Sequence, residues 1–396
     1  MEKVRLGMIG SRGAAHFHLN SLSKMRGLKV EVVAVASQKM ENASNLAREF
    51  SIPDAYDDYR RILERRDIDV VDLCIPTDLH ETFSIDAAEA GKHVICEKPL
   101  TGYFGKDRKE EHVGLVVPKE LMLKEALQGC DRVVQALRNN RVKFMYAENW
   151  VYAPPLLKLK RLLAASKGTI LEIRAEQGHS GSLAAYSRKW KTSGGGALMR
   201  LGSHPVGAAL HLKYFEGMLK HGKPIRLKSV TAETGHHTKM ESFVKEKEKY
   251  VASQWEDVED WGVMILHFED GSTATVFASD TVLGGIRNVL NIYLSNAVVH
   301  VNINPHDVLQ VYAPKPDIFG EEYLVEKLET KAGWNFPSPD DDWIKGFPQE
   351  LEDFIDAILF DREPVSGMDL ARDVVEAIYA GYVSAEKGQR IELRRG

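Results

Sequence analysis

What this chain of 396 residues has little of excludes several classes of protein. Its three cysteines, Cys74, Cys96 and Cys130, have no paired spacing, so neither a disulfide framework nor a cysteine-rich zinc site is expected. The 52 lysines and arginines face 57 aspartates and glutamates, which lacks the basic excess typical of nucleic-acid binding. No apolar run reaches membrane-spanning length, and the amino terminus shows no secretory signal. We expect a cytoplasmic protein without nucleic-acid or membrane partners.

Length and composition predict an ordinary folded protein of two domains. Hydrophobic residues make up 44% and charged residues 28%, which is the range of folded soluble chains. The alternation of elements changes character near Trp150. We therefore expect a nucleotide-binding domain over residues 1–150 and a substrate-binding and oligomerisation domain over residues 151–396.

The first half alternates short β-branched runs with amphipathic stretches, the pattern of a doubly wound parallel sheet. The expected strands are residues 4–9, 30–36, 70–75, 93–96 and 142–147. The expected helices are residues 14–25, 40–50, 59–64, 81–90 and 118–139.

The second half predicts a mostly antiparallel, open sheet. The expected strands are residues 169–177, 230–238, 262–267, 273–279, 288–294, 297–303 and 308–313. The pair Asp270-Gly271 between two of them is favoured in tight hairpins. Residues 351–387 return to helical periodicity, and the pattern leaves open whether they pack on this sheet or on the first domain.

Two charged segments, residues 102–117 and 244–250, are expected to be exposed loops. The first is longer than a usual strand-to-helix connection. A lid or an interface arm is the alternative, and its role stays open.

A glycine-containing turn joins the first expected strand to the first helix, where free helix N–H groups suit a pyrophosphate. Its sequence departs from the G-x-G-x-x-G motif, because Arg12 occupies the second glycine position and Ala15 the third. A plain tight turn is the alternative. The expected nucleotide contacts here are Gly10, Ser11, Arg12, Gly13 and Ala14.

The residue at the end of the second strand distinguishes NAD from NADP in such folds, because an acidic side chain there binds the ribose hydroxyls of NAD. Here Ser37 and Lys39 stand in that region and no acid does. The preference between NAD and NADP therefore stays open.

Two further strand ends converge on the expected ligand crevice. One of these strands, residues 93–96, is apolar and is followed by Glu97 and Lys98. The expected cofactor contacts are Ile75, Pro76, Thr77, His80, Glu97 and Lys98.

Several segments resemble the Gfo/Idh/MocA family, named for glucose-fructose oxidoreductase, inositol dehydrogenase and a rhizopine-catabolism protein. The segments are GKHV at residues 91–94, EKP at 97–99, GGGALMRLGSH at 194–204 and AGYVSA at 380–385. The resemblance implies a Rossmann domain, a second α/β domain with an open sheet, and hydride exchange between a nicotinamide and a sugar or polyol. It also implies that Lys98 is the acid-base residue, and we expect a cis Lys98–Pro99 bond.

One position departs from the family pattern, since Arg200 stands where an aspartate commonly precedes His204 by four residues. An Asp–His pair is therefore absent. His204 could contact the reacting hydroxyl with Lys98 as base, could itself be the base, or could be structural. Arg200 could bind an anionic substrate group or form an internal salt bridge.

Other polar and aromatic residues are expected near the substrate. Tyr146, Glu148, Asn149 and Tyr152 lie where the last strand of the first domain runs into the second domain. A polar loop after the next strand contributes His179, Tyr186, Arg188 and Trp190. Lys98 and His204 are the expected catalytic residues, with Arg200 and His204 also facing substrate. His16 with His18, and His236 with His237, lack partners at metal-ligand spacing, so no metal is expected.

The leading interpretation is an NAD(P)-dependent oxidoreductase acting on a secondary hydroxyl of a sugar, a polyol or an anionic sugar derivative. A redox-assisted glycoside hydrolase with recycled cofactor is the alternative, and a non-catalytic nucleotide sensor is a third. A homodimer or homotetramer is expected. The substrate, the oxidised carbon and the reaction direction are not specified by the sequence.

Overall fold

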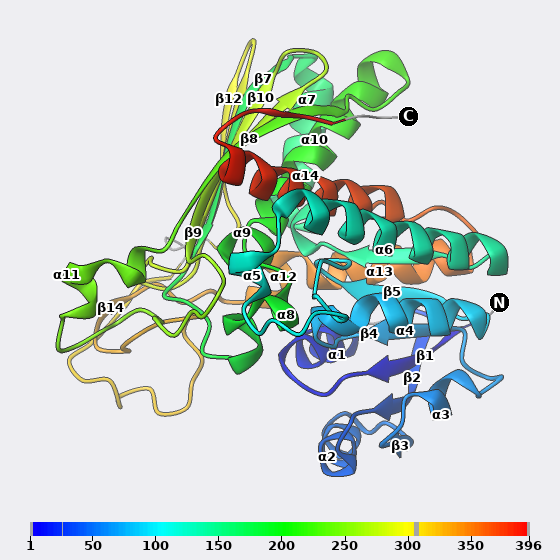
Figure 1. Ribbon diagram of the computed structural model, residues 1–396. Helices are drawn as coiled ribbons and strands as arrows, with labels where there is room; N and C mark the ends of the chain where they lie inside the picture. Colours follow the sequence, from blue (N-terminus) through cyan, green and yellow to red (C-terminus); the bar gives the residue numbers. More distant parts are fainter. Residues whose placement is uncertain (1–2, 26, 305–308, 394–396) are drawn as a thin grey trace.

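The computed structural model describes residues 3–25, 27–304 and 309–393, and its amino-terminal half is a parallel sheet (Figure 1). Six strands lie in the order β3-β2-β1-β4-β5-β6, and every neighbouring pair is parallel. The order reverses between β1 and β4, which is where such sheets bind ligands at their carboxyl edge. The strands are β1 Val4–Ile9, β2 Val30–Ala36, β3 Asp54–Tyr56, β4 Val70–Leu73, β5 His93–Glu97 and β6 Phe144–Ala147.

Helices connect these strands, as the alternating pattern predicts. They are α1 Gly13–Lys24, α2 Met40–Phe50, α3 Arg60–Leu63, α4 Thr77–Glu89, α5 Val113–Val116 and α6 Lys119–Asn140. Helix α4 begins earlier than the expected residue 81, because Pro76 at its N-cap has φ −60° and directs the chain into the helix. The doubly wound fold is confirmed. Strand β3 was not predicted, since three residues carry too little pattern.

The second half forms a seven-stranded mixed sheet in the order β12-β11-β7-β10-β9-β8-β15. Only β10 and β7 pair in parallel, so the expected, mostly antiparallel sheet is confirmed. Gly271, with φ 88°, lies in the tight turn between β9 and β10. The strands are β7 Ile170–Gly178, β8 Leu227–Gly235, β9 Trp261–Phe268, β10 Thr273–Ser279, β11 Arg287–Leu294, β12 Val298–Asn302 and β15 Ile391–Glu392.

One expected strand lies elsewhere. Residues 309–313 contain β13 (Val311–Ala313), which pairs with β14 (Gly333–Asn335) in a separate two-stranded sheet. Val308, the first residue of the prediction, lies outside the described residues. A strand pattern does not specify its partner, so the prediction of a strand in the large sheet was wrong here.

Helices α7, α9, α10 and α14 pack against this sheet, and α13 packs against the first half (Figure 1). The expected helical stretch 351–387 is two helices, of which α14 contacts both α6 and β8, while α13 contacts α1. Both packing alternatives are therefore realised. The helices and 3-10 turns are η1 Asn149–Tyr152, α7 Pro154–Ser166, η2 Ala185–Arg188, α8 Trp190–Ser193, α9 Ala197–Arg200, α10 Ser203–His221, η3 His237–Lys239, α11 Glu241–Val244, α12 Asp341–Lys345, α13 Phe347–Leu359 and α14 Met368–Lys387.

Residues 102–117, which we call the connecting arm, are only partly the exposed loop that their charges predict. Residues 106–112 are exposed, but residues 102–105 and 113–114 are buried. The Tyr103 amide donates to Tyr379 Oη at 2.6 Å, and the Gly114 amide donates to Asp257 Oδ2 at 2.8 Å. Both ends of the segment therefore contact the second half of the chain, as expected for an interface arm. Residues 245–250, by contrast, are exposed as predicted.

Candidate active site

The turn between β1 and α1 has the shape that a dinucleotide phosphate needs. Gly10 has φ 120°, and a Cβ there would lie 2.0 Å from the carbonyl oxygen of Cys74, so only glycine fits. Gly13 opens α1 and has open space around its missing Cβ. Arg12 caps the helix without a side-chain hydrogen bond, which leaves the first amides of α1 available to an anion. This cradle fits a pyrophosphate.

The expected ribose region lies beside this turn. The hydroxyls of Ser11 and Ser37 are 2.8 Å apart, so the ends of β1 and β2 are joined here. Ala14 is half-buried in the first turn of α1, whereas Lys39 is exposed at the start of α2. The structure thus brings the expected contacts from both strand ends together.

His80 holds two strand ends in place. It is buried in α4, with Nδ1 2.8 Å from the carbonyl oxygen of Pro99 and Nε2 2.9 Å from that of Ile75. Burial lowers the pKa of His80, and a neutral ring donates to one of these carbonyls only. The Lys98–Pro99 bond is cis, as expected. Pro76 is exposed at this edge and Thr77 is half-buried, which leaves both within reach of a ligand.

Lys98 follows β5 and reaches across to the second half of the chain. Its Nζ donates to the carbonyl oxygen of Arg200 at 2.8 Å. Burial lowers the pKa of Lys98, and Glu97 and, in its ionised form, Glu148 oppose that shift. A lysine with a lowered pKa is suited to accept a proton near neutral pH.

His204 has a carboxylate partner that the sequence pattern missed. Its Nδ1 lies 2.6 Å from Oε1 of Glu148, and its ring stacks on Trp150 at a centroid distance of 5.5 Å. Burial and the charge of Lys98 lower the pKa of His204, and burial raises that of Glu148. The pair is therefore held in its neutral form. The position of Glu148 directly after β6 indicated proximity to the site, but no spacing rule connects it to His204.

Arg200 pairs with Asp280 rather than pointing freely at a ligand. Its Nη1 lies 3.3 Å from Oδ1 of Asp280, its Nη2 binds Oδ2, and its guanidinium lies 4.6 Å from the ring centroid of Trp255. The internal salt bridge, one of the two alternatives, is thus present. His179 lies beside it, with Nδ1 3.7 Å from Asp280, and burial lowers the pKa of His179 to about 4.

Besides His179 and His204, four further expected substrate contacts lie in the protein interior. Asn149 donates to the carbonyl oxygen of Lys345, and the hydroxyl of Tyr152 donates to Asp353. The exposed fractions are 0% for Tyr146, 5% for Asn149, 3% for Tyr152 and 2% for Trp190. Such burial does not favour direct substrate contact, which stays a prediction for these four. Tyr186 is exposed and Arg188 is half-buried, so both remain accessible.

The segments that carry Arg200 and His204 are fixed by one buried acid. Glu259 accepts hydrogen bonds from the amides of Gly196 and Leu198 at 3.0 and 2.9 Å. The hydroxyl of Tyr382 donates to it at 2.8 Å. Burial raises the pKa of Glu259 to about 7. Two of the segments that resemble the family, residues 194–204 and 380–385, therefore meet at this carboxyl group.

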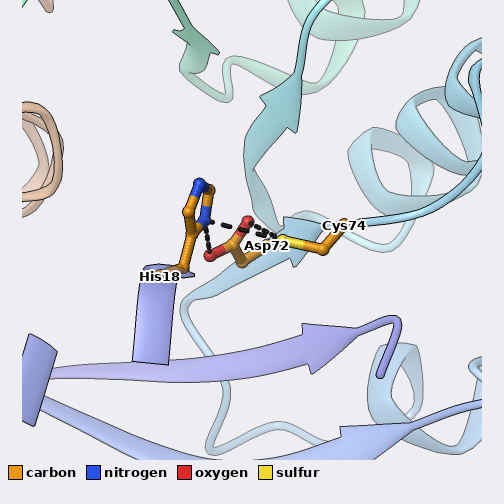
Figure 2. Close-up of side chains that lie close together, drawn as sticks. All are labelled: His18, Asp72 and Cys74. Atoms are coloured by element: carbon orange, nitrogen blue, oxygen red, sulfur yellow. Dashed lines mark hydrogen bonds and ion pairs between the residues drawn. The ribbon is translucent and has the colours of Figure 1, made fainter. Parts of the chain in front are cut away.

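A further cluster lies directly below the phosphate turn. Figure 2 shows His18, Asp72 and Cys74 pointing toward one another, with Nδ1 of His18 2.8 Å from Asp72 Oδ2 and 3.6 Å from Cys74 Sγ. All three side chains are buried. Sequence spacing did not reveal this cluster, because its members come from α1, β4 and the residue after β4.

The fold and this arrangement define a Rossmann-type, NAD-binding protein with a lysine at the sheet edge that reaches the second half of the chain. Residues 4–109 match the family model described as an oxidoreductase family with an NAD-binding Rossmann fold, and residues 156–300 match the Gfo/Idh/MocA C-terminal domain. The chain belongs to the Gfo/Idh/MocA family.

Individual relatives are similar over limited segments. A levoglucosan dehydrogenase of Pseudarthrobacter phenanthrenivorans is 39% identical over 107 residues, which cover 25% of this chain and 27% of that protein. Three curated relatives are matched over 30%, 27% and 36% of their own length, well under two thirds.

Solved structures share the whole fold. The structure of GenD2 from gentamicin A biosynthesis in complex with NAD has a TM-score of 0.80 at 23% identity, covering 100% of this chain and 97% of that one. Levoglucosan dehydrogenase in complex with NADH and L-sorbose has a TM-score of 0.73 at 20% identity and covers 100% of both chains. Among the described residues, no helix combines the length and apolarity needed to cross a bilayer.

Proposed function

We propose that this protein is an NAD(P)-dependent oxidoreductase that transfers a hydride between the nicotinamide and a secondary hydroxyl of a sugar or polyol. The observation that carries the proposal is the meeting of Lys98, from the edge of the parallel sheet, with His204 from the second domain. The Nζ of Lys98 donates to the carbonyl oxygen of Arg200, four residues before His204, at 2.8 Å. The charge of Lys98 also lowers the pKa of His204.

The turn at residues 10–14 would hold the pyrophosphate, and the edge formed by residues 75–77 and 97–98 would face the nicotinamide end. The cofactor supplies hydride chemistry when bound. The turn fits this role, since Gly10 admits no side chain and the first amides of α1 lack a side-chain cap.

Lys98 is the proposed proton acceptor. Loss of a hydride from the carbinol carbon makes the hydroxyl proton acidic, and a neutral amine at this position takes it up. The carbonyl oxygen of Arg200 fixes the direction of Nζ, and burial keeps part of the amine neutral.

His204 is the proposed partner on the substrate oxygen. With a protonated Glu148 donating to Nδ1, the ring proton sits on Nε2 and can donate to the hydroxyl oxygen. Glu148 thus orients the ring, in the place of the aspartate that Arg200 replaces. This assignment keeps Lys98 as the base.

The substrate is proposed to be a neutral carbohydrate. The guanidinium of Arg200, for which anion binding was one of two predicted roles, is already engaged by Asp280. The sugar-related names of similar proteins support the same class.

The test uses purified protein, from which any bound nucleotide is released by denaturation and identified. Sugars, polyols and glycosides are then screened with NAD and with NADP. We expect Lys98→Met to lose about 10²–10⁴-fold in kcat. The exposed Lys109 on the connecting arm provides the control, and Lys109→Met is expected to keep wild-type turnover.

Full activity in Lys98→Met would refute the role of the lysine. Glycoside cleavage without net cofactor reduction would instead support the redox-assisted glycoside hydrolase. Nucleotide binding without turnover of any compound would favour the sensor.

We also propose that the chain forms a homo-oligomer through the open side of the seven-stranded sheet. Leu171, Phe277 and Val298 on its strands are 54%, 39% and 55% exposed, which is unusual for apolar side chains in a sheet. Light scattering of the purified protein tests this, and a monomeric mass would refute it.

A further inference from the structure

A buried histidine lies between two carboxylates beneath the phosphate turn. His18 of α1 is 0% exposed. Its Nδ1 lies 2.8 Å from Asp72 of β4, and its Nε2 lies 3.3 Å from Oε1 of Glu97 at the end of β5. The contact of Nδ1 with Asp72 is a hydrogen bond, whereas Nε2 has no hydrogen-bond geometry toward Glu97 and lies within ion-pair distance of it. A doubly protonated imidazolium is attracted to both carboxylates.

The other groups that face His18 are neutral. Burial raises the pKa of the Cys74 thiol, which therefore keeps its proton. Glu350 of α13 is buried, and its two oxygens have no hydrogen-bond partner among residues 3–25, 27–304 and 309–393. Burial raises the pKa of Glu350 well above its ordinary value. The positive charge of His18 is thus matched by Asp72 and Glu97.

Two effects oppose each other at His18 and at Glu97. Burial works against a charged imidazole, yet Asp72 raises the pKa of His18 well above its ordinary value. Burial likewise works against a charged Glu97, yet His18 and Lys98 hold the pKa of Glu97 below its ordinary value. The two groups stabilise each other in charged form.

Glu97 connects this histidine to the proposed base. Its Oε1 faces His18, and its Oε2 accepts a hydrogen bond of 3.1 Å from the backbone amide of Lys98. Both carboxylate oxygens are therefore used, and the side chain is fixed from two sides.

We propose that His18 is a positioning residue for Lys98, because its imidazolium keeps Glu97 in place as a carboxylate directly before the base. This inference rests on the proposed function. His18 touches neither substrate nor reacting atoms; it acts through Glu97.

The consequence is a specific shift in pH dependence. The charged or titratable groups around Lys98 are Glu97, Glu148, Arg200, Glu326 and His204. Among them Glu97 gives the largest increase in the pKa of Lys98, opposing burial. If His18 loses its charge, buried Glu97 takes up a proton, and the pKa of Lys98 falls. Oxidation needs the neutral amine, so the acidic limb of the kcat profile moves to lower pH.

The experiment compares His18→Gln with His16→Gln. His16 lies on the same helix but pairs with Glu49, 3.4 Å away, on the opposite side from Glu97. We expect His18→Gln to lower kcat and to move its acidic limb down by about one pH unit or more, with unchanged nucleotide affinity. Glu97→Gln should move the limb in the same direction, and the double variant should add nothing further. His16→Gln should keep the wild-type profile.

Three outcomes would overturn the inference. One is a His18→Gln enzyme that melts at a lower temperature but keeps the wild-type pH profile. Another is a stoichiometric metal ion in the wild type that His18→Gln loses, since the donor atoms of His18, Asp72 and Cys74 lie within 4.8 Å of one another. The third is a neutral His18 ring at pH 7 in ¹⁵N NMR spectra of the wild-type protein.

The NMR measurement also covers the case in which His18→Gln does not fold. Two protonated ring nitrogens at pH 7 support the inference. Failure of the proposed function looks different, because the wild type would then show no turnover while the ring spectrum would still report an imidazolium.

Discussion

Lys98 Nζ donates to the backbone carbonyl of Arg200, 102 residues further along the chain. This contact ties the carboxyl edge of the parallel sheet to the helix that precedes His204. The side chain of Arg200 is in turn held by Asp280. The direction of the proposed base therefore depends on an ion pair in the other domain.

The Arg200–Asp280 pair is expected to be important for stability. Asp280 is 0% exposed, so Asp280→Asn leaves a buried guanidinium without a counter-charge and should cost about 3–5 kcal/mol in the free energy of unfolding. Urea unfolding measures this. As a control, Glu172→Gln breaks a largely exposed ion pair with Arg174 and should cost at most about 1 kcal/mol. Equal losses in both variants would contradict the importance of burial.

Two substitutions at Glu148 separate its protonation states. If a protonated Glu148 donates to His204, the amide of Glu148→Gln can replace that donor, and kcat should stay within about tenfold of the wild type. Glu148→Ala removes the partner and should lower kcat by about 10²-fold or more. Steady-state kinetics with the identified substrate decide this. A Gln variant as inactive as the Ala variant would show that the carboxylate charge is required.

Two glycines of the phosphate turn should respond differently to alanine. Gly10→Ala places a Cβ 2.0 Å from the Cys74 carbonyl in a backbone with φ 120°, so the fold itself should be destabilised. Gly13→Ala meets open space and should keep wild-type stability while weakening nucleotide binding. Thermal melting with and without NAD distinguishes the two effects. Unchanged nucleotide affinity in Gly13→Ala would argue against this turn as the phosphate site.

The protein should lose stability in mild acid. Burial lowers the pKa of His211 to about 3 and that of His179 to about 4, both below the ordinary value of 6.5. Between these values the unfolded chain binds protons that the folded chain does not, so stability is present above pH 6.5 and falls as the pH decreases. The slope is about 1.4 kcal/mol per pH unit for each histidine.

Urea unfolding at a series of pH values measures that slope. His211→Gln should flatten it, whereas His300→Gln, at an exposed position, should not. A slope that is identical in both variants would mean that other groups dominate.

The connecting arm should contribute to the stability of the protein through its hydrogen bond with the hydroxyl of Tyr379. Tyr379 Oη accepts from the Tyr103 amide and donates to the Gly194 carbonyl, each at 2.6 Å. Tyr379→Phe leaves both buried backbone groups without this partner, at a cost of about 1–3 kcal/mol in unfolding free energy. Tyr250→Phe, at an exposed tyrosine, should change stability by no more than about 0.5 kcal/mol. Faster hydrogen exchange of the Tyr103 amide in Tyr379→Phe would locate the effect.

Local patterns predicted most of the elements because each depends on near neighbours. The β-branched runs of β1, β2 and β4 and the amphipathic periods of α2 and α6 require no knowledge of the remaining chain. The errors concern partners. Strand β13 was recognisable as a strand, but not as a member of a separate sheet, and the arm's charges concealed the burial of its two ends.

The sequence by itself determined the alternation of elements, the glycine-containing phosphate turn and the lysine at the end of β5, because these depend on residues that are adjacent along the chain. Only the tertiary structure decided that Glu148 lies against His204, that Asp280 engages Arg200, and that His18 lies between Asp72 and Glu97. Those partners come from separate elements. Which of them meet depends on the packing of helices and sheets, and no spacing along the chain encodes it.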